Sequence, residues 1–295
     1  MIGAWLGAAA VGLSLGLLGS GGAILTVPIL VYFVGHDEKS AIAESLAIVG
    51  AIALLGAARA FRAKSVDVRS ALLLALPGIL GTAVGTRVSM LIPGAVQLSM
   101  LALLMGVAAV LMFRAGARPS QPISSPEPHA GPLRTSVWVV LAQGVALGLV
   151  TGLVGVGGGF LIVPMLVIVR GLPMHRAVGT SLAVIAINSM SGFLQVMMLQ
   201  GFDSASATSN GVAAGGAVAI LVVDWHTIAV FAAIGCAGSI AGNALGGRIP
   251  AAALRRAFAV LLLLMAGFIL VRSGPRIWNR PALSVLQWSV RTPLQ

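Results

Sequence analysis

The chain contains eight apolar segments of membrane-spanning length, and this feature limits what it can fold into more than any other. Charged or proline-rich stretches separate the segments, which cover residues 3–34, 41–58, 70–92, 96–113, 135–169, 177–199, 227–246 and 251–271. The hydrocarbon core of a bilayer takes about 20 helical residues. We therefore expect an all-α, polytopic integral membrane protein.

The composition excludes a water-soluble domain. Only 8% of the residues are charged and 58% are hydrophobic, whereas soluble domains carry roughly 25% charged residues. The net charge is +11, but the basic residues lie between apolar segments too long for a nucleic-acid-binding surface. Lipid headgroups and anions are therefore the expected partners, not nucleic acid. The single cysteine, Cys236, forms no internal disulfide, and the four histidines are far apart in sequence, so no metal site is predicted.

Two of the segments are too long for one straight crossing. Residues 3–34 and 135–169 each contain several glycines and a proline, which predicts a broken helix in each. The first segment lacks the basic residues that precede the apolar core of a secretory signal, so we expect it to belong to the mature protein.

A proline-rich linker divides the chain into two halves. Residues 114–134 contain five prolines, which no membrane helix would tolerate together. We assign residues 1–113 to a first membrane repeat, residues 135–272 to a second, and residues 273–295 to a C-terminal tail.

The two halves are related in sequence. At a constant shift of 136 residues, positions 16–49 align with 152–185 without gaps, and 15 of the 34 positions are identical. Biased composition alone would give roughly one identity in ten. Further on, three glycines match at a shift of 157, namely Gly78, Gly81 and Gly85 with Gly235, Gly238 and Gly242. The difference between the shifts, 21 residues, places an insertion near 200–223, which we expect to be interfacial or re-entrant.

The distribution of basic residues indicates that the halves have opposite orientations. Four basic residues, Arg59 to Arg69, follow the second segment of the first half, where the second half has none. Other turns of the second half are basic where the first half has only Lys39 and Arg87. Under the positive-inside rule, this reversal favours inverted repeats. The arginines from Arg272 onward argue otherwise, because inversion would leave them outside, so parallel repeats stay open.

A glycine motif recurs in the middle of both overlong segments. Glycines permit an unwound backbone, which inside a membrane must line a cavity or be buried in protein, and the following helix presents free N–H groups and a positive dipole end. Two such ends predict a binding site for a small anion. The alternative is that the glycines only allow close helix packing. The motif, G-x-G-G-x5-P, comprises Gly19, Gly21, Gly22 and Pro28, and again Gly155, Gly157, Gly158 and Pro164. Ser20 and Gly159, at variable positions within it, are further substrate-binding candidates.

Polar residues follow one face of the sixth segment. Ser181, Asn188 and Gln195 recur every seven residues, so they share a face that points into the bundle or toward a water-filled path. This face either binds a substrate or bonds neighbouring helices. Only the serine recurs in the first half, as Ser45. We take Ser45, Thr180, Ser181 and Asn188 as substrate-binding candidates.

Glu44 is the only acidic residue within an apolar segment, where the second half has Thr180. Burial favours the protonated form of a carboxyl group, so Glu44 could exchange protons and couple them to transport. Alternatively, a glutamate in the first helical turn caps its helix and faces the lipid headgroups.

Other features of the glycine-rich helices indicate structural roles. Arg87 and Arg248 end these helices and are expected to reach lipid phosphates, although a gating role is open. The pairs Gly81/Gly85 and Gly238/Gly242 have the small-xxx-small spacing of closely packed membrane helices. The sequence has no nucleophile–base pair, metal cluster or phosphate-binding lysine motif, so we expect no catalytic residue, no cofactor and no enzymatic activity.

The chain resembles the TauE/SafE sulfite-exporter family of membrane permeases. The similarity lies in GLVGVGGGFLIVP at 152–164, AVGTSLAVIAIN at 177–188, a later VDW at 223–225 and a GxxxGxxxGGRIP stretch from Gly238. It covers both halves, about 3–113 and 135–271. The first half departs from the pattern, because Glu44 replaces a small or hydroxyl residue and its glycine motif is shortened to GSGGA.

The resemblance implies a carrier in an inner (plasma) membrane of bacterial type that moves small anions such as sulfite or an organosulfonate outward. The glycine motifs, Ser45 and Ser181 would contribute to its site. We expect transport by alternating access of the two repeats. An anion channel of the same architecture and a non-transporting membrane assembly protein are the alternatives, and homo-oligomer formation is open.

Overall fold

The protein is described here by a computed structural model that covers residues 2–18, 22–116, 137–155, 162–163, 165–166, 172–209, 223–246, 259–260 and 262–272. Every regular element in these residues is helical, as expected for the fold class. The elements are α1 (Ile2–Leu18), α2 (Ala23–Ile29), the π-helical η1 (Leu30–Val34), α3 (Glu38–Arg62), α4 (Val68–Leu91), α5 (Gly94–Gly116), α6 (Val137–Val154), α8 (Met174–Ser209) and α9 (Trp225–Gly246). A shorter apolar helix covers Leu262–Arg272.

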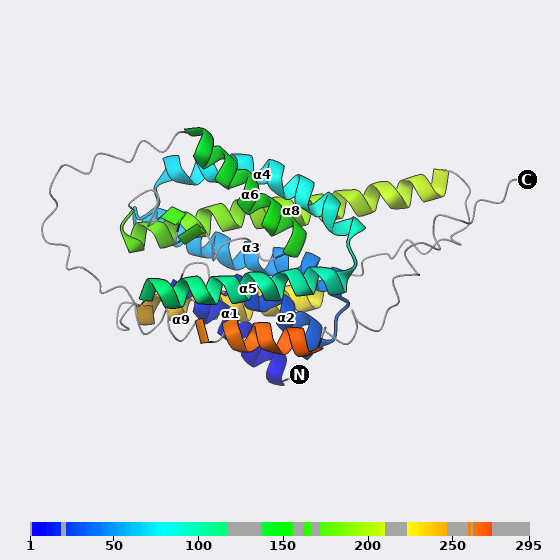
Figure 1. The fold of residues 1–295 in the computed structure, drawn as a ribbon, viewed down its shortest axis with the longest axis horizontal. Helices are drawn as coiled ribbons and strands as arrows, with labels where there is room; N and C mark the ends of the chain where they lie inside the picture. The colour runs from blue at the N-terminus through cyan, green and yellow to red at the C-terminus, as the bar shows by residue number, and fades with distance from the viewer. Residues whose placement is uncertain are drawn as a thin grey trace, which may run out of the picture.

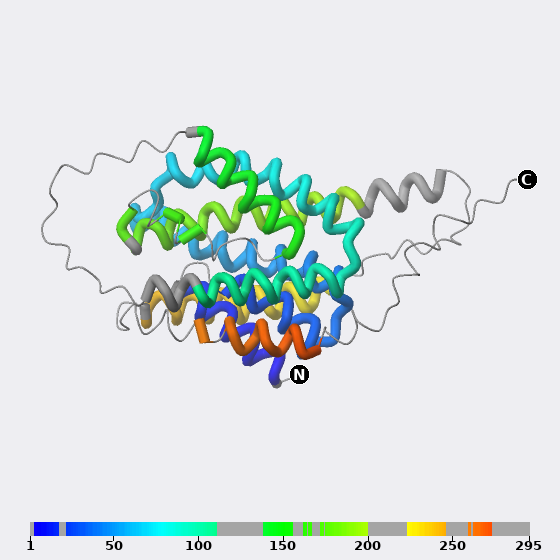
Figure 2. Tube along the Cα trace, viewed as in Figure 1, coloured from blue at the N-terminus to red at the C-terminus, as the bar shows by residue number. Residues whose placement is uncertain are grey.

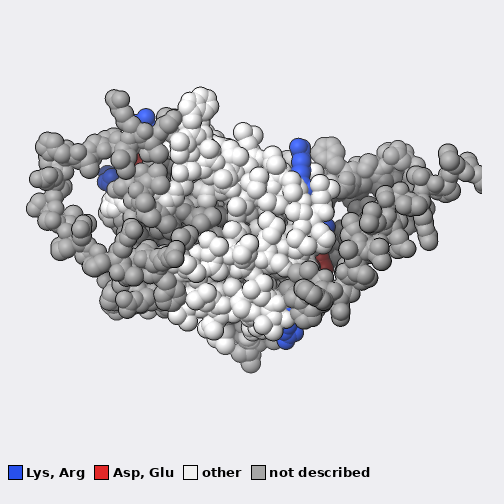
Figure 3. All heavy atoms as spheres, in the orientation of Figure 1, with Lys and Arg blue, Asp and Glu red and all other residues white. Residues whose placement is uncertain are grey.

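The surface of the bundle is apolar in the way that a lipid environment requires. Four described helices are long and apolar enough to cross a membrane, over Glu38–Arg62, Val68–Leu91, His175–Leu199 and Trp225–Leu245. Large apolar side chains face outward, including Leu80 (67% exposed) and Leu103 (68%), which only lipid can cover without cost. Figure 3 shows a largely uncharged band with the visible charged atoms toward its two ends. The protein is therefore an integral membrane protein.

Both overlong segments are interrupted, as predicted. In the first, α1 ends at Leu18 and α2 begins at Ala23. In the second, α6 ends at Val154 and is followed by Gly155, whose φ of 73° is left-handed. Residues with a side chain rarely adopt this backbone conformation, so a glycine is required there.

Helices from the two halves pair crosswise. The most extensive packing joins α4 to α6 and α1 to α9 (Figure 1). Glycines face backbone atoms of the opposite helix at matching positions. Gly78 contacts Gly148, and at the matching position Gly235 contacts Gly12. Four further glycines lie against backbone atoms of the facing helix: Gly81 against Val145, Gly85 against Leu149, Gly238 against Ala9 and Gly242 against Leu13. The prediction of close packing at the small-xxx-small pairs is thus confirmed, and each half packs its first helix against the other half.

The matching helices α3 and α8 run antiparallel. Gly56 of α3 lies against Leu182 of α8, Gly50 lies against Ser189, and Leu46 lies against Gly192. Positions therefore rise along one helix as they fall along the other. Antiparallel packing of matching segments is the relation that an inverted duplication predicts, and we propose that the two halves have opposite orientations.

The charged residues distinguish the two ends of the bundle. The turn from α3 to α4 carries the exposed Arg62, Lys64 and Arg69, and it lies at the start of α8, where Gly179 contacts Ser65. We call this the basic end, and by the positive-inside rule we propose that it faces the cytoplasm. We call the opposite end, where Glu38 begins α3 and Asp224 precedes α9, the acidic end.

Two boundaries differ from those expected. The helix containing Glu44 begins at Glu38 rather than near 41, because a charged first turn ends an apolar segment without ending a helix. The presumed insertion at 200–223 begins as a continuation of α8, which reaches Ser209. Residues 210–222, most of the linker and the tail lie outside the described residues.

The tube view separates the crosswise pairs. α4 and α6 lie with α8 on one side of the bundle, and α1 and α9 lie with α2 on the other, with α3 between them (Figure 2). Because α3 contacts both α8 and α9, it connects the two groups.

Candidate functional site

Six residues from six helices define the middle of the bundle. Gly235 of α9 lies between Gly12 of α1 and the Ile52 side chain of α3. Correspondingly, Gly78 of α4 lies between Gly148 of α6 and the Asn188 side chain of α8. We call the depth shared by these two contacts the central level. Ile52 and Asn188 are equivalent at the shift of 136, so the two contacts match except in polarity.

Asn188 is fully buried at the central level, and neither its amide nitrogen nor its amide oxygen has a hydrogen-bond partner. A Cβ atom on Gly78 would lie 2.6 Å from both amide atoms, so a glycine is needed to accommodate this side chain. The hydroxyl of Ser189, also buried, has no partner either. An unpaired buried amide costs about 1–3 kcal/mol. A water molecule, an ion or a bound ligand can supply the bonds that the protein does not provide.

The polar face of α8 points inward, as its seven-residue spacing predicts. Ser181 and Asn188 are fully buried, and the Ser181 hydroxyl donates to the carbonyl of Val178 at 2.8 Å. Gln195 is half-buried and donates from its amide nitrogen to the hydroxyl of Ser191 at 2.9 Å. The carbonyl oxygen of Gln195 has no partner.

Ser45 connects the first half to the break of the second. Its hydroxyl oxygen lies 2.6 Å from the carbonyl oxygen of Gly155 and 2.7 Å from that of Ile42, and it can donate to either. A Cβ atom on Gly155 would lie 2.6 Å from the side chain of Ile42. The structure thus brings together Ser45 and Gly155, two of the predicted site residues. The Ser45 hydroxyl thus links α3 directly to the backbone at the second break.

The two breaks lie on opposite sides of the central level. Gly155 lies beside Ser45, seven residues before Ile52 and thus about 10 Å toward the acidic end. α1 ends at Leu18, six residues after Gly12 and about 9 Å toward the basic end. Asn188 therefore lies between the depths of the two breaks.

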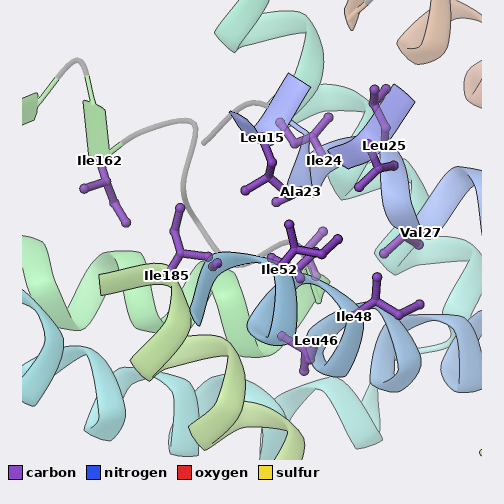
Figure 4. Packing of buried hydrophobic residues seen from close by; sticks show 14 of the residues in the cluster. Leu15, Ala23, Ile24, Leu25, Val27, Leu46, Ile48, Ile52, Ile162 and Ile185 are labelled. Carbon is purple, nitrogen blue, oxygen red and sulfur yellow. The ribbon is translucent and has the colours of Figure 1, made fainter. Parts of the chain in front are cut away.

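The start of α2 is buried beside the first break. Gly22 packs against α1, where a Cβ atom would lie 2.6 Å from the Ser14 hydroxyl oxygen. No side chain caps the first turn, and Ala23 and Ile24 are fully buried. Figure 4 shows Ala23 and Ile24 in the same apolar cluster as Leu46, Ile48 and Ile52 of α3. The other motif residues expected at the site, Gly19, Ser20, Gly21, Gly157, Gly158 and Gly159, lie outside the described residues.

Glu44 is fully buried in the second turn of α3 and forms two contacts at the acidic end. Its Oε1 accepts from the backbone N–H of Asp224 at 2.9 Å, and its Oε2 lies 2.6 Å from Nδ1 of His36. A first-turn glutamate facing the headgroups is therefore the wrong interpretation. The error arose because the apolar segment begins three residues after the helix does.

Thr180, the counterpart of Glu44, makes the equivalent contact at the basic end. Its hydroxyl accepts from the backbone N–H of Asp67 at 2.9 Å, and Asp67 is equivalent to Asp224 at the shift of 157. The sequence interpretation missed both aspartates. The shared pattern Asp-x-x-Ser or Asp-x-x-Thr would have placed both aspartates at the N-cap positions of α4 and α9.

Asp224 caps α9 with its side chain. Its carboxylate accepts from the Thr227 hydroxyl at 2.7 Å and from the backbone N–H groups of Thr227 and His226. The bonds from Thr227 hold the pKa of the Asp224 carboxyl below its usual value. This carboxylate therefore remains charged beside Glu44 and His36. At the same end, Arg87 is exposed, as expected for a residue reaching lipid phosphates, whereas Arg248 lies outside the described residues.

Known proteins resemble the chain over almost its whole length. A family model described as sulfite exporter TauE/SafE matches residues 4–269. A "probable membrane transporter protein" of Xylella fastidiosa (strain 9a5c) is 32% identical over 269 residues, which cover 89% of this chain and 92% of the relative. The "probable membrane transporter protein YunE" of Bacillus subtilis (strain 168) is 28% identical over 202 residues, 62% of this chain and 72% of the relative. No solved structure matches the chain.

Proposed function

The chain belongs to the sulfite exporter TauE/SafE family of membrane transporters, and from this premise we propose that it exports a small anion. Sulfite or a related organosulfonate is the proposed substrate, and alternating access is the proposed mechanism. The function is transport without chemical conversion of the substrate.

The unpaired amide of Asn188 is the observation that carries this proposal. Its Nδ2 group can donate to an anion oxygen at the central level, since no side chain or backbone group among the described residues accepts from it. Sulfite and sulfonates present three oxygens that accept hydrogen bonds. Backbone N–H groups of the two glycine motifs would supply further donors, so the anion can be held without a buried cation.

The crosswise pairing suggests which parts move. Backbone contacts at Gly78/Gly148 and Gly12/Gly235 hold the two helices of each pair in direct, close-packed contact. The α4–α6 pair and the α1–α9 pair are thus the natural rigid units, and each contains helices from both halves. We propose that these units rock against each other across α3 and α8, so that Asn188 faces one end of the bundle at a time.

Uptake into liposomes that contain the purified protein tests this function. We expect saturable uptake of sulfite or sulfoacetate, with competition from the other, and weaker uptake of small carboxylates that lack the third oxygen. Sulfate and thiosulfate complete the panel, and protein-free liposomes provide the background. Uptake of every anion at the background rate would contradict the proposal and favour a non-transporting membrane protein.

A further inference from the structure

We propose that His36 and Glu44 form a proton-binding site that opens toward solvent at the acidic end and controls the attachment of α9 to α3. A role of this site in coupling protons to transport rests on the function proposed above. Proton binding by the site does not depend on that function. Its ligand is the proton.

The two side chains combine a buried carboxyl group with a route to water. Nδ1 of His36 lies 2.6 Å from Oε2 of Glu44, and the side chains are 20% and 0% exposed, respectively. Protons from solvent can therefore reach Glu44 through the imidazole ring. The other carboxyl oxygen of Glu44 accepts the backbone N–H of Asp224, directly before α9. A change of charge on Glu44 thus acts on the start of α9.

The second half shows the same attachment without a titratable group. Thr180 accepts the backbone N–H of Asp67 before α4, as Glu44 accepts that of Asp224 before α9. The residue equivalent to His36 at the shift of 136 is Leu172. A threonine hydroxyl is therefore sufficient to attach the helix. The carboxyl–imidazole pair adds the capacity to bind protons, and it adds this capacity at the acidic end of the bundle only.

The proton steps can be followed atom by atom. With Glu44 ionised and His36 neutral, the Nδ1–H group donates to Oε2. A proton from water that binds Nε2 makes the ring an imidazolium, and the Nδ1 proton can then pass to Oε2, leaving neutral imidazole and a neutral carboxyl group. The backbone N–H of Asp224 then donates to an uncharged carboxyl group, and a hydrogen bond of this kind is weaker. A second proton on Nδ1 would place two donors opposite each other and separate the pair.

Other charged groups near the pair are occupied by their own contacts. The Asp224 carboxylate accepts from Thr227 and His226, and Asp37 accepts from the backbone N–H of Lys39. The ammonium group of Lys39 donates to the carbonyl of Met90 at the end of α4, and Glu38 lies against Gly94 of α5. The contact between His36 and Glu44 therefore involves none of these other groups.

Amide hydrogen exchange at the start of α9 tests the site without any substrate. After correction for the intrinsic exchange rate, protection at 223–228 in the full-length protein should fall at least about fivefold between about pH 7.5 and about pH 5.5, as the charge-assisted hydrogen bond becomes a neutral one. Glu44→Thr, which copies Thr180, should keep the protection but lose its pH dependence. His36→Leu, which copies Leu172, should shift or remove that dependence.

The equivalent attachment in the other half provides an internal control. Protection around Asp67, whose amide bonds to Thr180, should not depend on pH in any of these variants, and its loss would reveal a variant that does not fold. Protection at 223–228 that is independent of pH in the wild-type protein, or a pH dependence that survives Glu44→Thr, would overturn the proposal. A proton-sensitive α9 in a protein without anion flux would contradict the transport function and leave the proton site standing.

Discussion

Replacing Asn188 with isoleucine should reduce anion transport at least tenfold while making the folded protein more stable. Tenfold weaker binding corresponds to about 1.4 kcal/mol, less than one charge-assisted hydrogen bond is worth. Isoleucine should fit, because Ile52 occupies the equivalent position against Gly235. Removing two unpaired buried amide atoms should also raise the melting temperature, since burying them without partners is costly.

The opposite signs of these two effects separate a binding role from a structural one. Flux measured in liposomes gives the first effect, and thermal unfolding in detergent gives the second. Ser99→Ala is the control, because this serine donates within its own helix, to the carbonyl of Ala95 at 2.9 Å, and its loss should change neither quantity. Wild-type flux in the Asn188→Ile variant would show that Asn188 is not part of the substrate site.

Valine at Gly148 or at Gly12 should prevent the protein from assembling. A Cβ atom at either position would overlap backbone atoms of the facing helix, at Gly78 and Gly235 respectively, and a backbone cannot move aside as a side chain can. Overpacking of this kind costs about 3 kcal/mol or more. Valine has a better helix propensity than glycine, so any loss of stability comes from the close approach of the helices.

The amount of monodisperse protein and its melting temperature measure this effect. Gly106→Val is the matched control, because no other helix among the described residues has an atom within 4 Å of a Cβ atom built on this glycine of α5. The control should be at least as stable as the wild type. Normal assembly of both the Gly148→Val and Gly12→Val variants would show that the helices do not approach as closely as described.

The sequence predicted the fold class and the positions of the breaks, because these depend on local properties. Segment length, glycines and hydrophobicity were sufficient to predict the end of α1 and the end of α6. The close contacts at Gly81, Gly85, Gly238 and Gly242 were also predictable from their spacing. The helices that pack against these glycines were not predictable. A row of small residues shows that a helix face is closely packed, but it does not identify the helix that packs there.

The contacts of the site residues depend on positions far apart in the chain. Glu44 bonds to Asp224, 180 residues away, and Ser45 bonds to Gly155, 110 residues away. The polar face of α8 predicted that Asn188 points inward, but it could not distinguish a paired amide from an unpaired one. That distinction depends on Gly78, which offers space and no hydrogen bond. The expected helix start near residue 41, three residues after the observed start at Glu38, similarly concealed the burial of Glu44.

Counterflow in liposomes tests the central claim, that this protein carries a small sulfur-containing anion by alternating access, most directly. Vesicles are loaded with excess unlabelled sulfite, and labelled sulfite is added outside at trace concentration. A carrier should accumulate label transiently, and vesicles loaded with an inert salt should not, because internal unlabelled sulfite returns the loaded site to the outside and competes with the label for exit. Label that enters equally fast in both kinds of vesicle, without transient accumulation, would indicate a channel and contradict the account.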